Sequence, residues 1–278
     1  MTIDAATHYE NITGIWKEFM GDNFHFGYFE SEDTGLPQAA RTMVEKLLEP
    51  CEVNEETRIL DVGCGIGGPA FHIHERHHCP IDGISTSESG VRIANQASED
   101  KGHDKVRFKV ADGMDNGFPD NTFDLVWIME ASHPIPDKKA LFRECHRVLK
   151  QGGMLAMCDL VQLKVLPLYK GIWRLITNMR EFLFGVNVWG PAQILTMGNL
   201  CDRLIEAGFS RVRAVDITAK VTPTMRCWRE SALRYHDAET SEASRQYLDD
   251  FVKGCDNLES AYKEGLMGYG MLFALKQS

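Results

Sequence analysis

The stretch from Ile59 to Gly68, ILDVGCGIGG, constrains the fold of this chain more than any other feature. A short apolar run ends at Val62, glycines follow at three alternate positions, and a helical pattern begins directly afterwards. A glycine-rich turn between a strand and a helix lets a ligand approach the backbone at the helix N-terminus. The stretch therefore predicts the first strand, turn and helix of a ligand-binding α/β sheet.

Short apolar runs continue to alternate with helical patterns after this unit, which predicts parallel βαβ connections. We expect an α/β fold, with a doubly wound, seven-stranded, mostly parallel, Rossmann-like sheet and a helical cap. The expected strands are residues 58–62, 80–85, 106–111, 123–129, 154–159, 211–218 and 268–276. Helices are expected over 138–149, ending in a glycine stop at Gly152 and Gly153, and over 197–207.

Two regions do not fit this alternation and are expected to form the cap. We expect an N-terminal cap segment at residues 1–40, a cofactor-binding core at 41–160, a cap insert at 161–196, and the end of the core with a helical insertion at 197–278. Residues 225–265 look helical and mixed in charge. They either join the cap or form a long solvated connection.

Composition argues against several classes of function. Phosphate binding needs a concentrated Lys/Arg surface, whereas this chain has a net charge of −10 and no basic cluster interleaved with aromatic residues, so we expect no nucleic-acid partner. No apolar run approaches the roughly 18 residues of a membrane span, so no integral membrane contact is expected. The start MTIDAATHYEN lacks a signal-peptide pattern, and the eight cysteines include no C-x-x-C pair. These features predict a cytoplasmic protein with reduced thiols.

Asp61 favours one of the two ligand classes that such a turn holds, dinucleotides and S-adenosylmethionine. It lies at the carboxyl end of the first expected strand, two residues before Gly63. A carboxylate there would repel a pyrophosphate and attract the methionyl ammonium group of S-adenosylmethionine. The charge favours the sulfonium cofactor and leaves an NAD-dependent oxidoreductase as the weaker alternative.

The first motif of the class I S-adenosylmethionine-dependent methyltransferases resembles ILDVGCGIG, residues 59–67. The resemblance implies S-adenosyl-L-methionine as the cofactor and S-adenosyl-L-homocysteine as the product. Asp112 looks like the adenine clamp of that family, although a turn aspartate that caps its own backbone is the alternative. Ser85 and Thr86 stand where many members place an acidic ribose ligand. The expected cofactor contacts are Asp61, Gly63, Gly65, Gly67, Ser85, Thr86, Asp112, Gly113, Met114, Tyr28 and Glu130.

Polar residues at two strand ends suggest where the chemistry takes place. The fourth expected strand is followed by His133 and the fifth ends in Asp159, so neighbouring strands can bring both to one rim. An imidazole with a pKa near neutrality suits a general base, and a carboxylate can fix its tautomer. The alternatives are that His133 only shapes the loop before Pro134 and that Asp159 caps a helix of the insert.

A narrower resemblance rests on MEASHPIPDKKALFRECHRVLKQGG and on Asn23 to Phe29, NFHFGYF. These stretches are similar to small-molecule methyltransferases related to the rebeccamycin sugar O-methyltransferase and to the tocopherol and sterol C-methyltransferases. The resemblance implies that residues 23–29 fold over the cofactor, and that the family's proposed catalytic histidine and aspartate fall on His133 and Asp159. Pro134 stands where a second histidine is common in that group, so the resemblance implies no histidine pair here.

A competing motif, the H-E-x-x-H of zinc proteases, spans His74 to His78. These histidines fall near the far end of the first helix, away from the strand ends where ligands gather, and no third ligand is indicated. We expect surface histidines and no metal site.

The acceptor is expected to be a largely apolar small molecule of natural-product type. The aromatic cap candidates have an ordinary helix core face as their alternative role. The cap candidates are Trp173, Met179, Phe182, Phe184, Trp189 and Met197, and the expected acceptor contacts are His25, Trp173, Phe182 and Trp189. We expect O-methylation with His133 as base; C-methylation and a non-methylating role such as cyclisation stay open, as does a homodimer.

Overall fold

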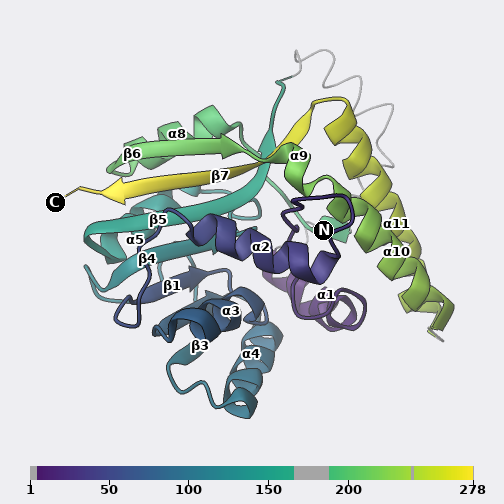
Figure 1. Ribbon diagram of the computed structural model, residues 1–278, viewed down its shortest axis with the longest axis horizontal. Helices are drawn as coiled ribbons and strands as arrows, with labels where there is room; N and C mark the ends of the chain where they lie inside the picture. Colours follow the sequence, from purple (N-terminus) through teal and green to yellow (C-terminus); the bar gives the residue numbers. More distant parts are fainter. Residues whose placement is uncertain (1–4, 166–187, 239–240, 278) are drawn as a thin grey trace.

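The computed structural model describes residues 5–165, 188–238 and 241–277. One seven-stranded sheet in the order β3-β2-β1-β4-β5-β7-β6 crosses the molecule (Figure 1). Its strands are β1 Ile59–Val62, β2 Ile81–Ser85, β3 Val106–Val110, β4 Phe123–Met129, β5 Leu149–Gln162, β6 Phe209–Asp216 and β7 Met267–Lys276. β7 runs antiparallel to both β5 and β6, and the pairs from β3 to β5 are parallel. The predicted fold class is confirmed.

Helices cover both faces of the sheet, so that strands β1, β4 and β5 are buried on both sides. The helices are α1 Ala5–Met20, α2 Leu36–Leu48, α3 Gly68–His77, α4 Glu88–Lys101, α5 Lys138–Val148, α8 Met197–Glu206, α9 Thr218–Val221, α10 Pro223–Ala238 and α11 Glu242–Lys263. One hydrophobic cluster includes Met43 of α2 and Ile73 of α3 on one face, and a second includes Leu141 of α5 and Leu204 of α8 on the other. The sheet therefore lies between two helical layers, each packed on it through a hydrophobic cluster.

The strand register brings the carboxyl ends of four strands to one edge. Val62 pairs with Ile84 of β2 and with Ile128 of β4, and Met129 of β4 pairs with Cys158 of β5. Residues just after these positions must therefore lie side by side at that edge. The edge is where ligands collect in open parallel sheets.

Helices α1, α10 and α11 form a bundle beside this edge (Figure 1). Trp16 of α1, Trp228 of α10 and Phe251 of α11 are buried in one cluster, with the Trp16 and Phe251 ring centroids 6.4 Å apart. The Trp16 indole N–H also donates to the Tyr247 hydroxyl at 2.6 Å. The helical segment after residue 223 thus packs on the N-terminal helix, instead of forming a solvated connection.

The segment between α1 and α2, residues 23–29, is called the strap below. Four consecutive backbone amides of the strap donate to four separate elements. These bonds join Phe26 N to Glu130 Oε1 (2.7 Å), Gly27 N to Thr224 Oγ1 (3.1 Å), Tyr28 N to Ala39 O (2.8 Å) and Phe29 N to Lys220 O (2.8 Å). A loop with four consecutive amides paired in this way has a defined path across the edge of the sheet.

The structure corrects the expected glycine stop after α5. The helix ends at Val148, and β5 begins at Leu149 and continues through both glycines. Gly152 takes a left-handed φ of 79°, and a Cβ on Gly153 would lie 2.9 Å from the Lys150 carbonyl oxygen. The glycines therefore permit an irregular start of the strand, opposite a register shift in β4, instead of capping the helix.

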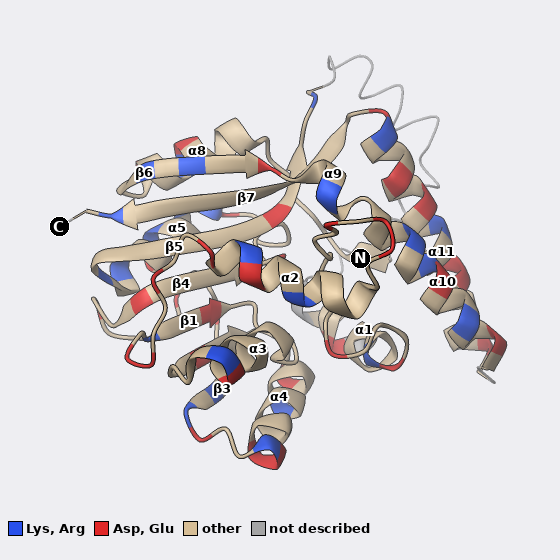
Figure 2. Ribbon diagram, in the orientation of Figure 1, with Lys and Arg blue, Asp and Glu red and all other residues tan. Residues whose placement is uncertain are grey.

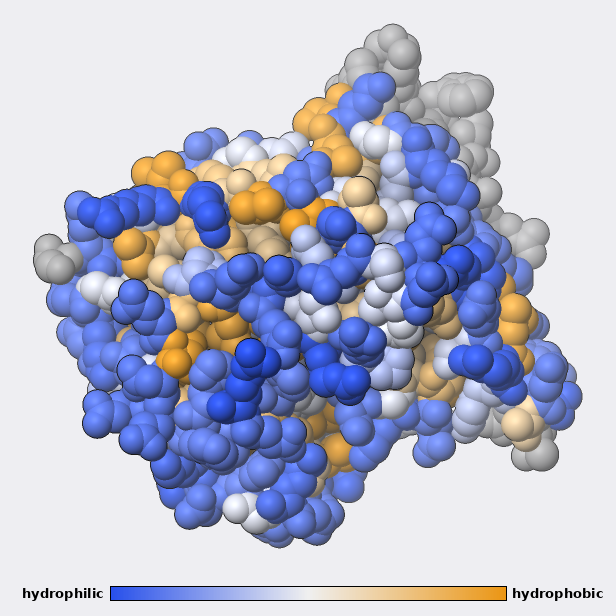
Figure 3. All heavy atoms as spheres, in the orientation of Figure 1, coloured by the Kyte–Doolittle hydropathy of each residue, from blue (hydrophilic) through white to orange (hydrophobic). Residues whose placement is uncertain are grey.

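Acidic and basic residues are interspersed along the helices and strands of the ribbon (Figure 2). Hydrophobic side chains gather over β6 and β7 (Figure 3), where Val215, Met271 and Phe273 line a shallow hollow beside Lys46 and Arg213. Within the described ranges, every helix is too short or too polar to cross a bilayer.

Candidate active site

A cavity of about 910 Å³ opens at the carboxyl ends of the strands. The loop after β1 and the ends of β2 and β3 line one part, and α1, the strap, the loop after β4, residues 189–194 and α11 line the other. Pockets for a single drug-sized ligand range from about 300 to 1,000 Å³, with a few polar groups in a mainly apolar wall. This cavity is near the upper end of that range, so the described residues leave space for a second small molecule beside a bound cofactor.

Asp61 is the buried carboxylate of the first part. Its side chain is 3% exposed, and Oδ2 has no hydrogen-bond partner among the described residues. Burial raises the pKa of this carboxyl to about 7, because desolvation disfavours the charged form. A buried polar atom without a partner is costly, so a ligand cation placed here would remove that cost.

The glycines of the loop have different roles. A Cβ on Gly63 would lie 2.0 Å from the Ala131 Cβ, whereas a Cβ on Gly65 would meet nothing within 4 Å. Gly63 therefore allows the loop after β4 to approach, and Gly65 keeps the backbone open towards the cavity. Gly67 does not line the cavity; a Cβ there would collide with the rings of Phe71 and Phe108. The structure thus gives Gly67 a packing role and does not support a cofactor contact.

The predicted adenosine contacts lie together at the far end of this part. Ser85, Thr86, Asp112, Gly113 and Met114 all line the cavity. Asp112 Oδ1 accepts a hydrogen bond from the Met114 backbone N–H at 2.8 Å. One oxygen of this carboxylate therefore caps the turn, as the alternative interpretation predicted. The exposed side chain keeps its other oxygen available. Adenine and ribose binding by these residues stays a prediction.

The charge of Asp61 and the open backbone at Gly65 fit an S-adenosylmethionine molecule. A ligand without a hydrogen-bond donor would leave the Asp61 carboxylate unpaired, and a pyrophosphate would meet it with like charge. An α-ammonium group supplies the missing donor, and the open backbone at Gly65 allows the close approach that a methionyl chain needs.

The second part of the cavity contains a histidine and carboxylate pair. His133 Nδ1 lies 2.8 Å from Asp159 Oδ1, and both side chains are buried. Asp159 also accepts from the Ser132 hydroxyl (2.6 Å) and from the backbone amides of Ser132, His133 and Leu160. Burial alone would raise the pKa of Asp159, but these donors and the His133 imidazole hold it below its usual value. The carboxylate is therefore ionised and fixed in place.

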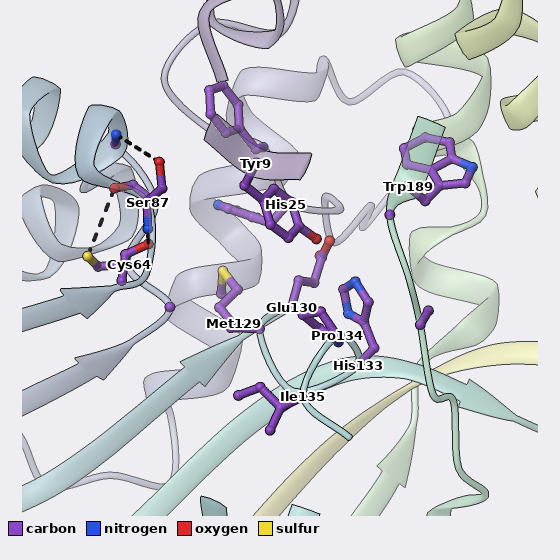
Figure 4. Close-up of a pocket in the computed structure, with 18 of the residues that line it drawn as sticks. Tyr9, His25, Cys64, Ser87, Met129, Glu130, His133, Pro134, Ile135 and Trp189 are labelled. Carbon is purple, nitrogen blue, oxygen red and sulfur yellow. Dashed lines mark hydrogen bonds between the residues drawn. The ribbon is translucent and has the colours of Figure 1, made fainter. Parts of the chain in front are cut away.

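The same contact orients the His133 ring. Burial would lower the pKa of His133, but the Asp159 charge and hydrogen bond more than offset this and raise it. Because an ionised carboxylate only accepts, Nδ1 carries a proton and the neutral ring leaves Nε2 as its acceptor atom. The His133 ring points into the cavity beside Glu130 (Figure 4). The pairing expected from the two strand ends is present; a catalytic role for it remains a proposal.

Three other predicted contacts fall at different places. His25 lines the cavity; its Nδ1 lies 2.9 Å from the Phe26 carbonyl oxygen, and burial lowers its pKa to about 4. Trp189 also lines the cavity and packs against the Trp228 ring. Tyr28 does not line it: its ring lies between Lys46 and Lys220 at the shallow hollow by β6, which does not support a cofactor contact.

The cap candidates Trp173, Met179, Phe182 and Phe184 lie outside the described residues. Sequence reasoning missed several residues of the acceptor wall because no local motif marks them. These are Tyr9 and Trp16 of α1, Trp228 of α10, and Asn257 and Leu258 of α11. Ser132, which holds Asp159, could have been noticed as the hydroxyl residue next to the predicted base.

The zinc-protease pattern has a structural explanation. His74 is buried, with Nδ1 2.8 Å from the Cys79 carbonyl oxygen, so the expectation of a surface histidine is wrong for His74. His78 lies past the end of α3 in a left-handed conformation, which removes it from the helical i, i+4 geometry. Glu75 pairs with Lys101 and His103. Across the described ranges, no group of three or more His, Cys, Asp or Glu residues is arranged to hold a metal ion.

Comparisons with known proteins agree with this geometry. A family model described as a methyltransferase domain matches residues 60–157. The chain is 28% identical to 27-O-demethylrifamycin SV methyltransferase of Amycolatopsis mediterranei (strain S699), over 96% of this chain and 95% of that protein. It is 34% identical to the chloroplastic tocopherol O-methyltransferase of Arabidopsis thaliana, over 54% of this chain but only 47% of that enzyme.

The fold also recurs among solved structures. The crystal structure of the mycolic acid cyclopropane synthase CmaA1, complexed with SAH and CTAB, has a TM-score of 0.85 to this chain. The likeness covers 99% of both chains at 16% sequence identity and so concerns the fold alone. The family match makes residues 60–157 a methyltransferase domain, the orphaned carboxylate at the glycine loop suits an S-adenosylmethionine cofactor, and the chain as a whole is similar to methyltransferases that act on small molecules.

Proposed function

We propose that this enzyme methylates a hydroxyl group of a largely apolar natural product, with His133 as the general base. The pair formed by His133 and Asp159 carries the proposal. A hydroxyl loses its proton as it attacks a methyl group, and an imidazole held with Nε2 free can receive that proton. Asp159 then stabilises the imidazolium that forms. A relative that matches nearly the full chain is named as the methyltransferase of 27-O-demethylrifamycin SV, a name that points to an oxygen that lacks its methyl group, which supports oxygen as the nucleophile.

The residues of the chain would position the cofactor and the acceptor and would exclude water from the space between them. When bound, S-adenosylmethionine supplies an electrophilic methyl group on a sulfonium centre. Asp61 would bind its ammonium group, and Asp112, with Ser85 and Thr86, would bind the adenosine end. Holding the acceptor oxygen in line with the methyl group accounts for much of the acceleration expected in such a reaction.

The acceptor wall is aromatic, which supports an apolar ring system or macrocycle as the acceptor. Trp16, Trp189 and Trp228 line it, and their rings pack against one another at centroid distances of 5.7 to 6.2 Å. His25, neutral because burial lowers its pKa, would offer Nε2 as one hydrogen-bond acceptor to the bound acceptor molecule. We assign acceptor contacts to His25 and Trp189 on this basis.

The test is a methyl-transfer screen with S-adenosylmethionine and a panel of hydroxylated polyketides, phenols and terpenoids, in which mass spectrometry and NMR locate the new methyl group. We expect an O-methyl product. In His133→Ala, kcat should fall by about 10²–10⁴-fold, while the affinity for S-adenosylhomocysteine, measured by calorimetry, stays within about threefold. Full turnover of an alcohol acceptor by His133→Ala would refute the base assignment, and a C-methyl product would refute oxygen as the nucleophile.

A further inference from the structure

Glu130 is a carboxyl group on the cavity wall that the proposed mechanism does not use. It directly follows β4, and its φ of 52° places it in the left-handed region, which is unfavourable for a residue with a Cβ. Its backbone N–H donates to the Cys158 carbonyl oxygen at 2.9 Å. An unfavourable backbone held in this way directs the side chain to a defined place, and such positions cluster at functional sites.

One oxygen of Glu130 takes both of the hydrogen bonds that this carboxyl makes. The Phe26 backbone N–H donates to Oε1 at 2.7 Å, and the Tyr269 hydroxyl donates to the same atom at 2.5 Å. Oε2 has no partner among the described residues, and Glu130 lines the cavity. When the group is a neutral acid, its proton therefore lies on Oε2, because Oε1 already accepts two donors.

The surroundings favour the neutral acid at physiological pH. Burial raises the pKa of Glu130 to about 8; the Tyr269 and Phe26 donors and the His133 ring lower it, and the Asp159 charge raises it further. The other titratable groups that face it are Tyr9 of α1, Tyr262 of α11 and Cys158 of β5. Burial raises the pKa of each of these three well above neutrality, so they are uncharged.

Glu130 and His133 lie three residues apart in one loop, and Figure 4 shows both side chains directed into the same part of the cavity. The rest of this wall is mainly aromatic. A donor and a base placed together on an apolar wall match a ligand with two oxygens near each other: one that donates its proton to the base, and one that accepts a hydrogen bond.

We propose that Glu130 binds the acceptor by donating a hydrogen bond from Oε2, and that the enzyme selects acceptors with a second oxygen within a few bonds of the methylated hydroxyl. Hydroxyketones, diols and dihydroxyarenes have this pattern. The proposal differs from the cofactor contact expected for Glu130 from sequence. It rests on the proposed function in one respect only, namely that the methylated atom is a hydroxyl oxygen.

The experiment compares two acceptors that share a skeleton, one with both oxygens and one without the second, in the wild type, Glu130→Gln and Glu130→Ala. A glutamine keeps a carbonyl-type oxygen for the two donors and an N–H donor towards the cavity, so it mimics the neutral acid. We expect the wild type and Glu130→Gln to prefer the dioxygenated acceptor by about tenfold in kcat/KM, and Glu130→Ala to lose most of that preference. A glutamine variant as indiscriminate as the alanine variant would overturn the proposal.

The pH dependence gives a second readout. The KM of the wild type for the dioxygenated acceptor should rise above pH 8 as Glu130 loses its proton, and should stay flat in Glu130→Gln. Tyr269→Phe removes one donor that favours the charged form, so this rise should move to higher pH. A wild-type KM that is unchanged from pH 7 to pH 9.5 contradicts the proposal.

Infrared difference spectra test the protonation state without any acceptor. In the S-adenosylhomocysteine complex at pH 7, the wild type should show the C=O band of a protonated carboxyl that is missing in Glu130→Gln. Absence of this difference band would refute a neutral Glu130 even if no acceptor were known. Because neither this band nor the acceptor preference depends on His133 as base, failure of the proposed function and failure of this inference are distinguishable.

Discussion

The two parts of the cavity are built in different ways. On the cofactor side, Asp61 of β1 and Gly65 of the turn after it lie four residues apart in the chain, Ser85 ends β2, and Asp112 follows β3. On the acceptor side, the wall combines α1, the strap, the loop after β4, residues 189–194, α10 and α11. The cofactor side depends on short-range motifs, whereas the acceptor side depends on the packing of distant segments. Substitutions should therefore separate the two functions.

The largest loss of turnover without a loss of cofactor affinity is expected for Asp159→Asn. An asparagine carries no charge to stabilise the imidazolium. Its amide N–H can also donate to Nδ1, which favours the tautomer with the proton on Nε2, so that Nε2 cannot act as the base. We therefore expect kcat to fall by about 10²–10³-fold. Calorimetry should show S-adenosylhomocysteine affinity within about threefold of the wild type. Asp82→Asn, which removes a strand carboxylate bound to Arg58 outside the cavity, is the matched control and should leave kcat nearly unchanged.

The pH profile sharpens this prediction. His133 must be neutral to accept a proton, and its pKa is raised in the wild type mainly because Asp159 offsets the effect of burial. Activity should rise as pH increases through this pKa. Removing the carboxylate lowers the pKa of His133, so the acidic limb of kcat/KM should shift to lower pH in Asp159→Asn. A limb that does not move would show that His133 is not the titrating group.

The opposite effect, a loss of cofactor affinity, is expected for Asp61→Asn. Loss of the carboxylate should weaken S-adenosylhomocysteine binding by about 10²-fold, the effect of removing one charge from a buried pair. The ligand-free protein should become more stable. Because the folded-state pKa of Asp61 is raised to about 7, the ionised carboxyl destabilises the fold at every pH above that value, and the penalty accumulates as pH rises from about 4 to 7.

Thermal denaturation at pH 8 measures this effect. The melting temperature of ligand-free Asp61→Asn should rise by roughly 2–4 °C for each kcal/mol recovered, and saturating S-adenosylhomocysteine should raise it much less than in the wild type. If the variant bound the ligand as well as the wild type, the cofactor would not use this carboxylate.

The smallest effect concerns the pH dependence of cofactor binding in the wild type. The charged form of Asp61 binds the ammonium group, so protonation competes with the ligand below pH 7. The dissociation constant for S-adenosylhomocysteine should rise by up to about tenfold per pH unit below 7, and binding at pH 6.5 should release protons. Calorimetry in buffers with different ionisation enthalpies detects this release. Asp61→Asn should show no such release.

The sequence predicted those parts of the site that follow from strand order. His133 and Asp159 could be paired in advance because adjacent parallel strands end at one edge, and β4 and β5 are adjacent. Tyr28 could not be placed, because a loop residue next to a cofactor-binding segment can face either side of it. Its ring lies between two lysines at the hollow by β6, away from the cavity.

The sequence by itself determined the sheet, the glycine turn and the carboxylate at its rim, because each depends on periodicity and on residues close together in the chain. Only the tertiary structure decided which oxygen of Glu130 stays free. The Phe26 amide lies 104 residues before Glu130 and the Tyr269 hydroxyl lies 139 residues after it, so both reach Oε1 only once the strap and β7 are in place. Contacts over such separations follow from packing and leave no local pattern in the sequence.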